Sequence, residues 1–239
     1  MKRRAIIYRM IPIYIIVIVV LIVVAQKGSQ TVTTYIENQP IKNRICIIID
    51  PGHGGIDGGA TSCSGVLESQ LNLQISLCLR DLFHLLGRKT LMIRTEDISI
   101  HTEGSTIAQM KVSDLKQRVK IVNETENSLL VSIHQNHFSD SKYYGPQVFY
   151  GKGQGSGNLA QEMQAALNKY LCPNSKRKTK SAGGVYLMEK INRTGILVEC
   201  GFLSNPGEDK KLNTPAYQKQ LSCVIAATCC NYLKYNDIA

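Results

Sequence analysis

Two histidines and one glutamate stand out because each follows, or begins, a segment of regular pattern. His53 lies in the glycine-rich stretch PGHGGIDGGA, Glu68 begins an amphipathic segment, and His134 ends the apolar run SLLVSIH. Two imidazoles and one carboxylate form the three-ligand set of a catalytic zinc site, in which a fourth position stays open for water. We therefore predict that His53, Glu68 and His134 bind one zinc ion.

Glu199 is the candidate catalytic group. It lies in the apolar run GILVECGF, between Val198 and Cys200. Burying an unpaired carboxylate is costly, so this position needs a reason. Catalysis provides one, because a carboxylate in a dry site beside a metal can accept a proton from the attacking water and later protonate the leaving amine. A buried ion pair with a lysine or arginine is the alternative.

Each of these residues also has an ordinary structural explanation. The spacings are long, so the sequence offers no local geometric check, and an acidic residue at a helix N-terminus is favourable to the helix dipole in any protein. Of the three further histidines, two have only a structural explanation and one is a weaker functional candidate. His84 lies inside a predicted helix and His101 in a predicted loop, whereas His137 is near enough to His134 to contact a substrate.

Apolar runs alternate with amphipathic segments along the chain, and these elements must bring the four residues together. Gly87 is placed to end the first helix. We expect helices at 68–86, 112–123, 158–171 and 217–232. We expect strands at 45–50, 89–95, 128–134, 146–151, 184–189 and 195–202.

This alternation predicts an α/β fold with a central, mostly parallel sheet and helices on both faces. We expect a single catalytic domain at residues 44–236. In such sheets ligands bind at the carboxyl ends of the strands. Asp50 with His53, then His134, then Glu199 fall at or just past three strand ends, which is the observation that most favours a common site.

The N-terminus predicts export. Lys2, Arg3, Arg4 and Arg9 precede an uncharged apolar run, Met10–Ala25. The basic residues should stay in the cytoplasm, so the chain after the run should lie outside. Residues 1–25 are then a membrane anchor or a signal peptide that is cleaved after Ala25, and both interpretations stay open. Residues 26–43 are the expected linker.

Charge and cysteine content exclude less than the N-terminus does. Without the four N-terminal basic residues, 24 of the 28 basic residues remain, which is six more than the 18 acidic residues. This excess suits an anionic polymer such as cell wall, and export argues against nucleic acid. Eight cysteines in an exported protein would ordinarily suggest disulfides. Most of them lie in apolar patterns, so we expect mostly free, buried thiols.

Four motifs in order resemble a known family. IIIDPGHGG, LESQLNL at Glu68, SIHQN at His134 and LVECGFLSNPGED at Glu199 are similar to the zinc-dependent N-acetylmuramoyl-L-alanine amidases of the amidase-3 type, from about residue 45 to 235. The resemblance implies that His53, Glu68 and His134 are metal ligands and that Glu199 is the catalytic glutamate. It also implies hydrolysis of the amide between muramic acid and L-alanine, with peptidoglycan as the partner.

The short chain, with its N-terminal apolar run and no wall-binding repeats, most resembles the sporulation and germination members. They form muramic-δ-lactam in the spore cortex, and an accessory or activator protein at the membrane surface is a further expected partner. Thr194, Glu189 and His137 depart from the family pattern and concern substrate contacts and metal affinity. The basic loop 173–184 either meets the wall or is simply solvated, and we favour the second. A zinc peptidase and an inactive wall-binding protein are the alternative functions.

Overall fold

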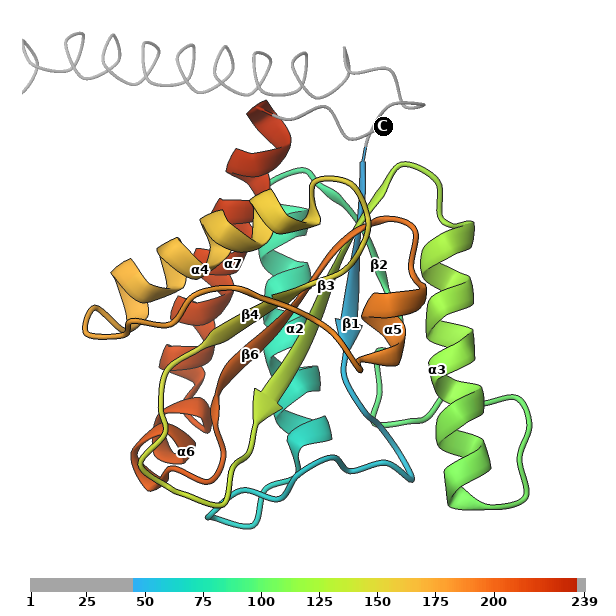
Figure 1. Ribbon diagram of the computed structural model, residues 1–239, viewed down its shortest axis with the longest axis horizontal. Helices are drawn as coiled ribbons and strands as arrows, with labels where there is room; N and C mark the ends of the chain where they lie inside the picture. The colour runs from blue at the N-terminus through green and yellow to red at the C-terminus, as the bar shows by residue number, and fades with distance from the viewer. Residues whose placement is uncertain (1–44, 236–239) are drawn as a thin grey trace, which may run out of the picture. The chain divides into compact units, whose positions relative to one another are not determined.

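A six-stranded sheet lies at the centre of the computed structural model, which describes residues 45–235 (Figure 1). Its strand order is β2-β1-β3-β6-β4-β5. The strands β2, β1, β3 and β6 are mutually parallel, whereas β4 runs antiparallel to β6. The strands are β1 Cys46–Pro51, β2 Lys89–Met92, β3 Ser128–Asn136, β4 Gln147–Tyr150, β5 Lys180–Ser181 and β6 Thr194–Phe202.

Helices cover both faces of this sheet (Figure 1). The larger apolar core lies between the sheet and α2, α4 and α7, and the smaller core lies between the sheet and α3 and α5. The α/β class is therefore confirmed, with a mixed sheet. The helices are α2 Glu68–Leu85, α3 Ile107–Glu124, α4 Ser156–Leu171, α5 Tyr186–Lys190, α6 Pro206–Leu212 and α7 Pro215–Tyr235.

The strand that we predicted at 184–189 is wrong, because these residues lead into the short helix α5. Leu187 and Met188 of this helix, together with Ile191 just after it, pack into the smaller core. The sheet edge is formed instead by β5. Helix α6 was not predicted, although Asn205 accepts hydrogen bonds from the first backbone N–H groups and Pro206 follows it, a common helix start.

The predicted N-terminal anchor or signal (1–25) and linker (26–43) lie outside the described residues. Within residues 45–235, no helix is both long and apolar enough to cross a membrane. All eight cysteines are free. Only Cys46, Cys200 and Cys229 are fully buried, and Cys63 and Cys223 are exposed, so the thiols are less buried than the sequence pattern indicated.

Candidate active site

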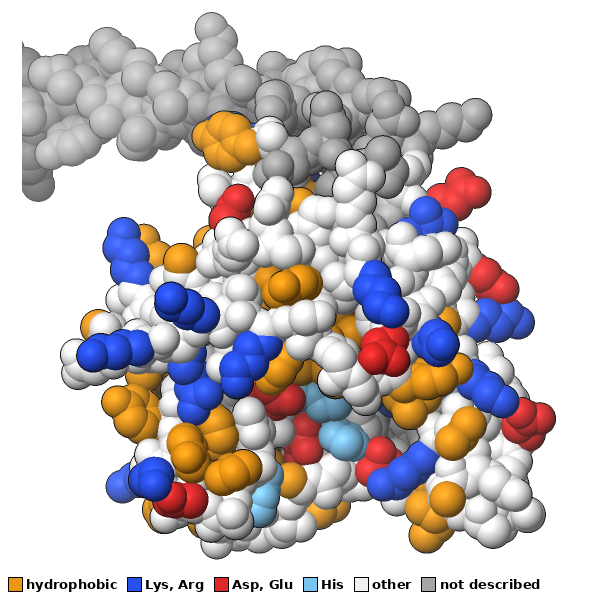
Figure 2. Space-filling view, viewed as in Figure 1, with side chains coloured by type: hydrophobic (Ala, Val, Ile, Leu, Met, Phe, Trp, Pro, Cys, Tyr) orange, Lys and Arg blue, Asp and Glu red, His pale blue; other side chains and the backbone are white. Residues whose placement is uncertain are grey.

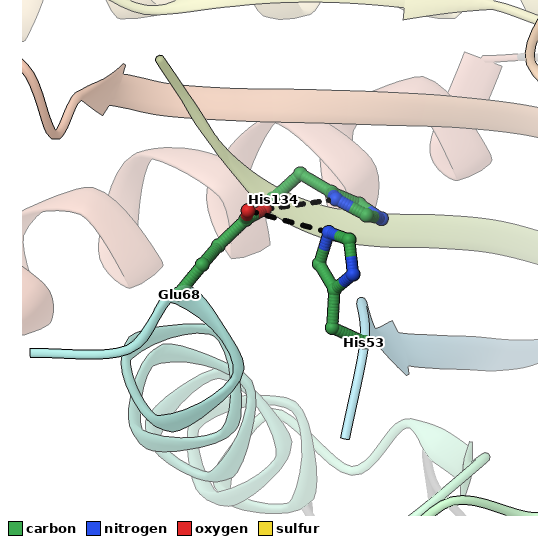
Figure 3. A group of neighbouring side chains, drawn as sticks. All are labelled: His53, Glu68 and His134. Atoms are coloured by element: carbon green, nitrogen blue, oxygen red, sulfur yellow. Dashed lines mark hydrogen bonds and ion pairs between the residues drawn. The ribbon is translucent and has the colours of Figure 1, made fainter. Parts of the chain in front are cut away.

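His53, Glu68 and His134 meet at the carboxyl ends of β1 and β3 and the start of α2 (Figure 3). Glu68 lies between the two imidazoles, with its Oε2 3.3 Å from Nε2 of His53 and its Oε1 3.1 Å from Nδ1 of His134. One ligand atom from each residue lies within 4.8 Å of the others. The structure therefore brings together the three residues that the sequence singled out, in an arrangement that can hold a metal ion.

Buried arginines fix the backbone of the loop that carries His53. Arg118, on α3, donates to the carbonyl oxygens of Pro51 at 2.9 Å and of His53 at 2.7 Å. Arg94 donates to the carbonyl oxygens of Pro51 at 2.9 Å and of Gly52 at 3.0 Å. Asp50, at the end of β1, forms an ion pair with Arg118 and so holds this arginine beside the loop. The two arginines provide the hydrogen-bond partners that the loop carbonyl groups would otherwise find in a helix or sheet.

Two glycines let the chain pass close to the site. A side chain at Gly52 would lie 2.2 Å from the His134 ring, and one at Gly59 would lie 2.6 Å from the Glu68 carboxylate. Gly59 also has a φ of +68°, which L side chains rarely adopt. His53 itself has a φ of 61°, so the loop holds this side chain in a backbone conformation that is uncommon for a non-glycine residue.

The carboxylate of Glu68 is oriented by several donors. Its Oε2 accepts the N–H of Ala60 at 2.9 Å, and its Oε1 accepts the N–H of Gln135 at 3.1 Å. Burial would raise the pKa of Glu68, but the hydrogen bonds and charge of His134 and His53 outweigh burial and hold the pKa well below its usual value. Glu68 is therefore an ionised acceptor, as a metal ligand must be.

Asp57 is a functional candidate that the sequence reasoning missed. Its Oδ2 lies 2.9 Å from Nδ1 of His53, and its Oδ1 lies 2.7 Å from the Lys111 ammonium of α3. Burial lowers the pKa of His53, but Asp57 and Glu68 outweigh it and raise the pKa to about 9. A carboxylate on one ring nitrogen leaves the other nitrogen for a metal. The signal was a carboxylate four residues after a histidine in one loop.

Replacing Asp57 with asparagine should weaken zinc binding by about 10–100-fold, because an outer partner that fixes the ring and raises its basicity is removed. Competition with a chromophoric chelator measures this affinity. Asp81→Asn is the matched control, because Asp81 is an exposed aspartate that pairs with Arg80 on α2. Equal zinc affinity in the two variants would remove the positioning role of Asp57.

Glu199 lies beside the three residues, on the neighbouring strand. It is the register partner of His134 across β3 and β6, so both side chains lie on one face of the sheet. Its Oε2 is buried and has no hydrogen-bond partner in the described part of the chain. Burial raises the pKa of Glu199 to about 7, with a smaller opposing effect from His134. No lysine or arginine pairs with it among residues 45–235, which disfavours the ion-pair explanation.

The remaining sequence candidates lie away from these contacts. The Nε2 of His84, on α2, lies 2.7 Å from the hydroxyl oxygen of Thr90, on β2. The Nδ1 of His101 lies within hydrogen-bond distance of the Ser99 hydroxyl. His137 is exposed just after β3. Glu189 accepts the N–H of Gly184, and Thr194 donates to the carbonyl oxygen of Gln154, so both have structural partners.

The arrangement combines three side chains that can hold a metal ion with an adjacent carboxyl group, Glu199, whose pKa is near neutrality. A group with such a pKa can both accept and release a proton at physiological pH. Figure 2 shows the histidines (pale blue) and acidic side chains (red) at the surface in the middle of this face. A large substrate can therefore reach them.

Comparison with known proteins gives consistent matches. The family model described as N-acetylmuramoyl-L-alanine amidase matches residues 47–231. A germination-specific N-acetylmuramoyl-L-alanine amidase of Bacillus subtilis is 38% identical over 188 residues, which cover 78% of each chain. The structure of the CwlD amidase from Clostridioides difficile, in complex with the GerS lipoprotein, superposes with a TM-score of 0.77 at 36% identity, covering 81% of this chain and 100% of that one. A further amidase structure from Clostridium difficile has a TM-score of 0.70 at 30% identity, covering 81% of this chain and 99% of that one.

Proposed function

We propose that zinc serves the catalysis of this chain, which belongs to the N-acetylmuramoyl-L-alanine amidase family and hydrolyses the amide bond between muramic acid and L-alanine in peptidoglycan. His53, Glu68 and His134 are the proposed ligands, and Glu199 is the proposed acid–base group. The observation that carries this proposal is the unpartnered, buried Oε2 of Glu199 next to a compact set of metal-ligating side chains.

The donor set fits zinc. Two imidazole nitrogens and one carboxylate oxygen are typical ligands of catalytic zinc, and the three side chains leave room for a fourth ligand. Zinc, when bound, lowers the pKa of water and polarises a carbonyl oxygen. Asp57 keeps Nε2 of His53 available as a ligand atom, and the N–H groups of Ala60 and Gln135 keep Glu68 ionised and oriented.

Glu199 performs the proton transfers in this proposal. Its ionised carboxylate takes a proton from the water that attacks the scissile carbonyl carbon. The same carboxyl group then donates that proton to the departing alanine nitrogen, so that the amine leaves in a stable form. A pKa near 7 suits both steps, and the lack of competing hydrogen bonds in the described structure leaves Oε2 free to act.

The products distinguish this reaction from the alternatives. Digestion of purified peptidoglycan by the zinc-loaded protein should release intact glycan strands and peptides that begin with a free L-alanine amine. Mass analysis of the products and end-group labelling measure this result. Cuts within the peptide would favour a zinc peptidase, and no products from the zinc-loaded protein would favour an inactive wall-binding protein. New reducing sugar ends would indicate a glycosidase.

We further propose that the enzyme acts outside the cytoplasm, on the peptidoglycan of the spore cortex. There it removes the stem peptides, the step that must come before muramic-δ-lactam can form. The germination-specific relative and the N-terminal basic and apolar sequence support this location. A reporter that works only outside the cytoplasm should be active when fused after residue 40. Activity of a cytoplasmic reporter at the same position would contradict both the location and the substrate.

An accessory protein at the membrane surface is a proposed partner. The support is that the CwlD amidase was solved in complex with a lipoprotein. Co-purification of this chain with lipoproteins from sporulating cells tests the proposal, and recovery of the chain alone after mild cross-linking would contradict it.

A further inference from the structure

We infer that Arg177 is a specificity residue that binds a carboxylate of the leaving stem peptide; this inference rests on the proposed function. Arg177 belongs to the basic loop 173–184, for which the sequence favoured a merely solvated role. Its lysine neighbours Lys176, Lys178 and Lys180 are exposed, whereas Arg177 is half-buried. The loop therefore turns one of its cations toward the protein.

The guanidinium of Arg177 is held by neutral groups. Its Nε donates to the carbonyl oxygen of Tyr144 at 2.9 Å, and its Nη1 donates to Oε1 of Gln147 at 3.2 Å. Its Cζ lies 4.7 Å from the centre of the Phe202 ring. Stacking and two hydrogen bonds fix the plane of the guanidinium, which is the preorganisation that carboxylate recognition requires.

No anion in the described part of the chain pairs with Arg177, and its Nη2 donates to no acceptor there. Burial raises the pKa of the nearby Glu208, and two backbone hydrogen bonds, Lys211 and, least of all, Arg177 oppose this rise. The Oε2 of Glu208 instead accepts the backbone N–H groups of Gly145 at 2.9 Å and Phe202 at 2.8 Å. The Nη2 group of this oriented guanidinium is therefore available to an anion that a ligand supplies.

The position of Arg177 indicates which part of the substrate it meets. The strand order places β1 and β3, which lead to the metal-ligating residues, on one side of Glu199. Gln147, on β4, is the register partner of Glu199 on the other side, and Arg177 lies just beyond Gln147. If Glu199 protonates the departing nitrogen, the peptide that starts at this nitrogen continues toward Gln147 and Arg177.

The distance selects a residue near the start of that peptide. Cross-strand partners have Cβ atoms about 5 Å apart, and a hydrogen bond separates Gln147 from the guanidinium. An extended chain advances about 3.3 Å per residue, so Arg177 is about two residues beyond the leaving nitrogen. The first alanine has its carboxyl group in a peptide bond. The recognised anion is therefore a free carboxylate on the second or third residue.

An aromatic surface flanks this cation. Tyr143 stacks on Phe202 with ring centres 6.2 Å apart, and Phe138 meets Tyr143 edge-on at 5.0 Å. Phe138 and Tyr143 are 51% and 39% exposed. Figure 2 shows hydrophobic side chains, with basic ones next to them, to the left of the histidines, where Figure 1 draws the β3–β4 loop and α6. These rings can pack against the aliphatic part of a peptide while Arg177 binds its charge.

Peptide binding without turnover tests this assignment. The probes are a synthetic tripeptide with a free N-terminal L-alanine and carboxylates on its second and third residues, and the same tripeptide with these groups amidated. Both are titrated calorimetrically into the full chain in chelator, so that no hydrolysis contributes. The wild type should bind the acidic peptide about tenfold more tightly than the amidated one, the discrimination expected of one charged hydrogen-bonded pair.

The variants locate the preference. Arg177→Gln should bind both peptides equally, Arg177→Lys should recover part of the preference, and Lys176→Gln, which removes an equal charge from the same loop, should keep all of it. With peptidoglycan fragments, Arg177→Gln should raise KM about tenfold and leave kcat within about threefold.

A wild type that does not distinguish the two peptides would overturn the inference, and this comparison stands even if Arg177→Gln folds poorly. A preference that survives in Arg177→Gln would also overturn it. Failure of the wild type to release peptides with N-terminal alanine would instead count against the proposed function, which the product analysis measures separately.

Discussion

Replacing Glu199 with glutamine should lower the rate of amide hydrolysis by about 10²–10⁴-fold, which is the usual value of general acid–base catalysis. Glutamine has the shape of glutamate but cannot exchange a proton at neutral pH. Because Glu199 is not one of the three proposed metal ligands, zinc content should stay at that of the wild type. Product release from peptidoglycan and metal analysis of the same sample measure both quantities.

Stability separates catalysis from a structural role in this variant. Burial raises the pKa of Glu199 to about 7, above the unfolded value of 4.5, so stability falls as the pH rises from about 4.5 to about 7, and the full cost remains above pH 7. Glutamine removes that cost, and in chelator at pH 8 the melting temperature of Glu199→Gln should be no lower than that of the wild type. Glu162→Gln, an exposed position on α4, is the control. A strongly lowered melting temperature with activity retained in the folded fraction would make Glu199 a structural residue.

The sequence predicted the framework of the site because the framework depends on period and strand ends. The apolar runs before Asp50 and His134, and the run around Glu199, are strands β1, β3 and β6, and parallel strands place their carboxyl ends at one edge. The start of α2 at Glu68 followed from an equally regular helical pattern. The meeting of these distant residues was predictable because each strand and helix that positions them has its own local sequence pattern.

Features that depend on loop geometry could not be predicted in this way. Asp57 contacts His53 because of the backbone path of one glycine-rich loop, and Lys111 reaches Asp57 only when α3 is packed. The reversed direction of β4 places Gln147 opposite Glu199, and the fold-back of loop 173–184 brings Arg177 to Gln147. Neither relation leaves a periodic signal in the sequence. Helix α5 was missed because its five residues are too few to show a helical period.

Replacing His134 with alanine should abolish zinc binding, with less than about a tenth of the wild-type metal content after dialysis, and hydrolysis should fall with it. A catalytic zinc site uses three protein ligands, and loss of one leaves too few donors to retain the ion. His134 is also one of the two imidazoles adjacent to Glu68, so its loss leaves Glu68 with His53 alone. Metal analysis by mass spectrometry, together with activity at saturating added zinc, measures the effect.

His84→Ala is the matched control, because His84 is an exposed histidine on α2 whose ring contacts Thr90 and not the site. It should keep both zinc and activity. Folding of His134→Ala is checked by its melting temperature in chelator, because the ring lies against Gly52 and its removal leaves a small space there. Full zinc content in a folded His134→Ala would remove the ligand assignment. Iron instead of zinc in the wild type would also contradict the proposal, because the same two-histidine, one-carboxylate set is used by iron(II) oxygenases.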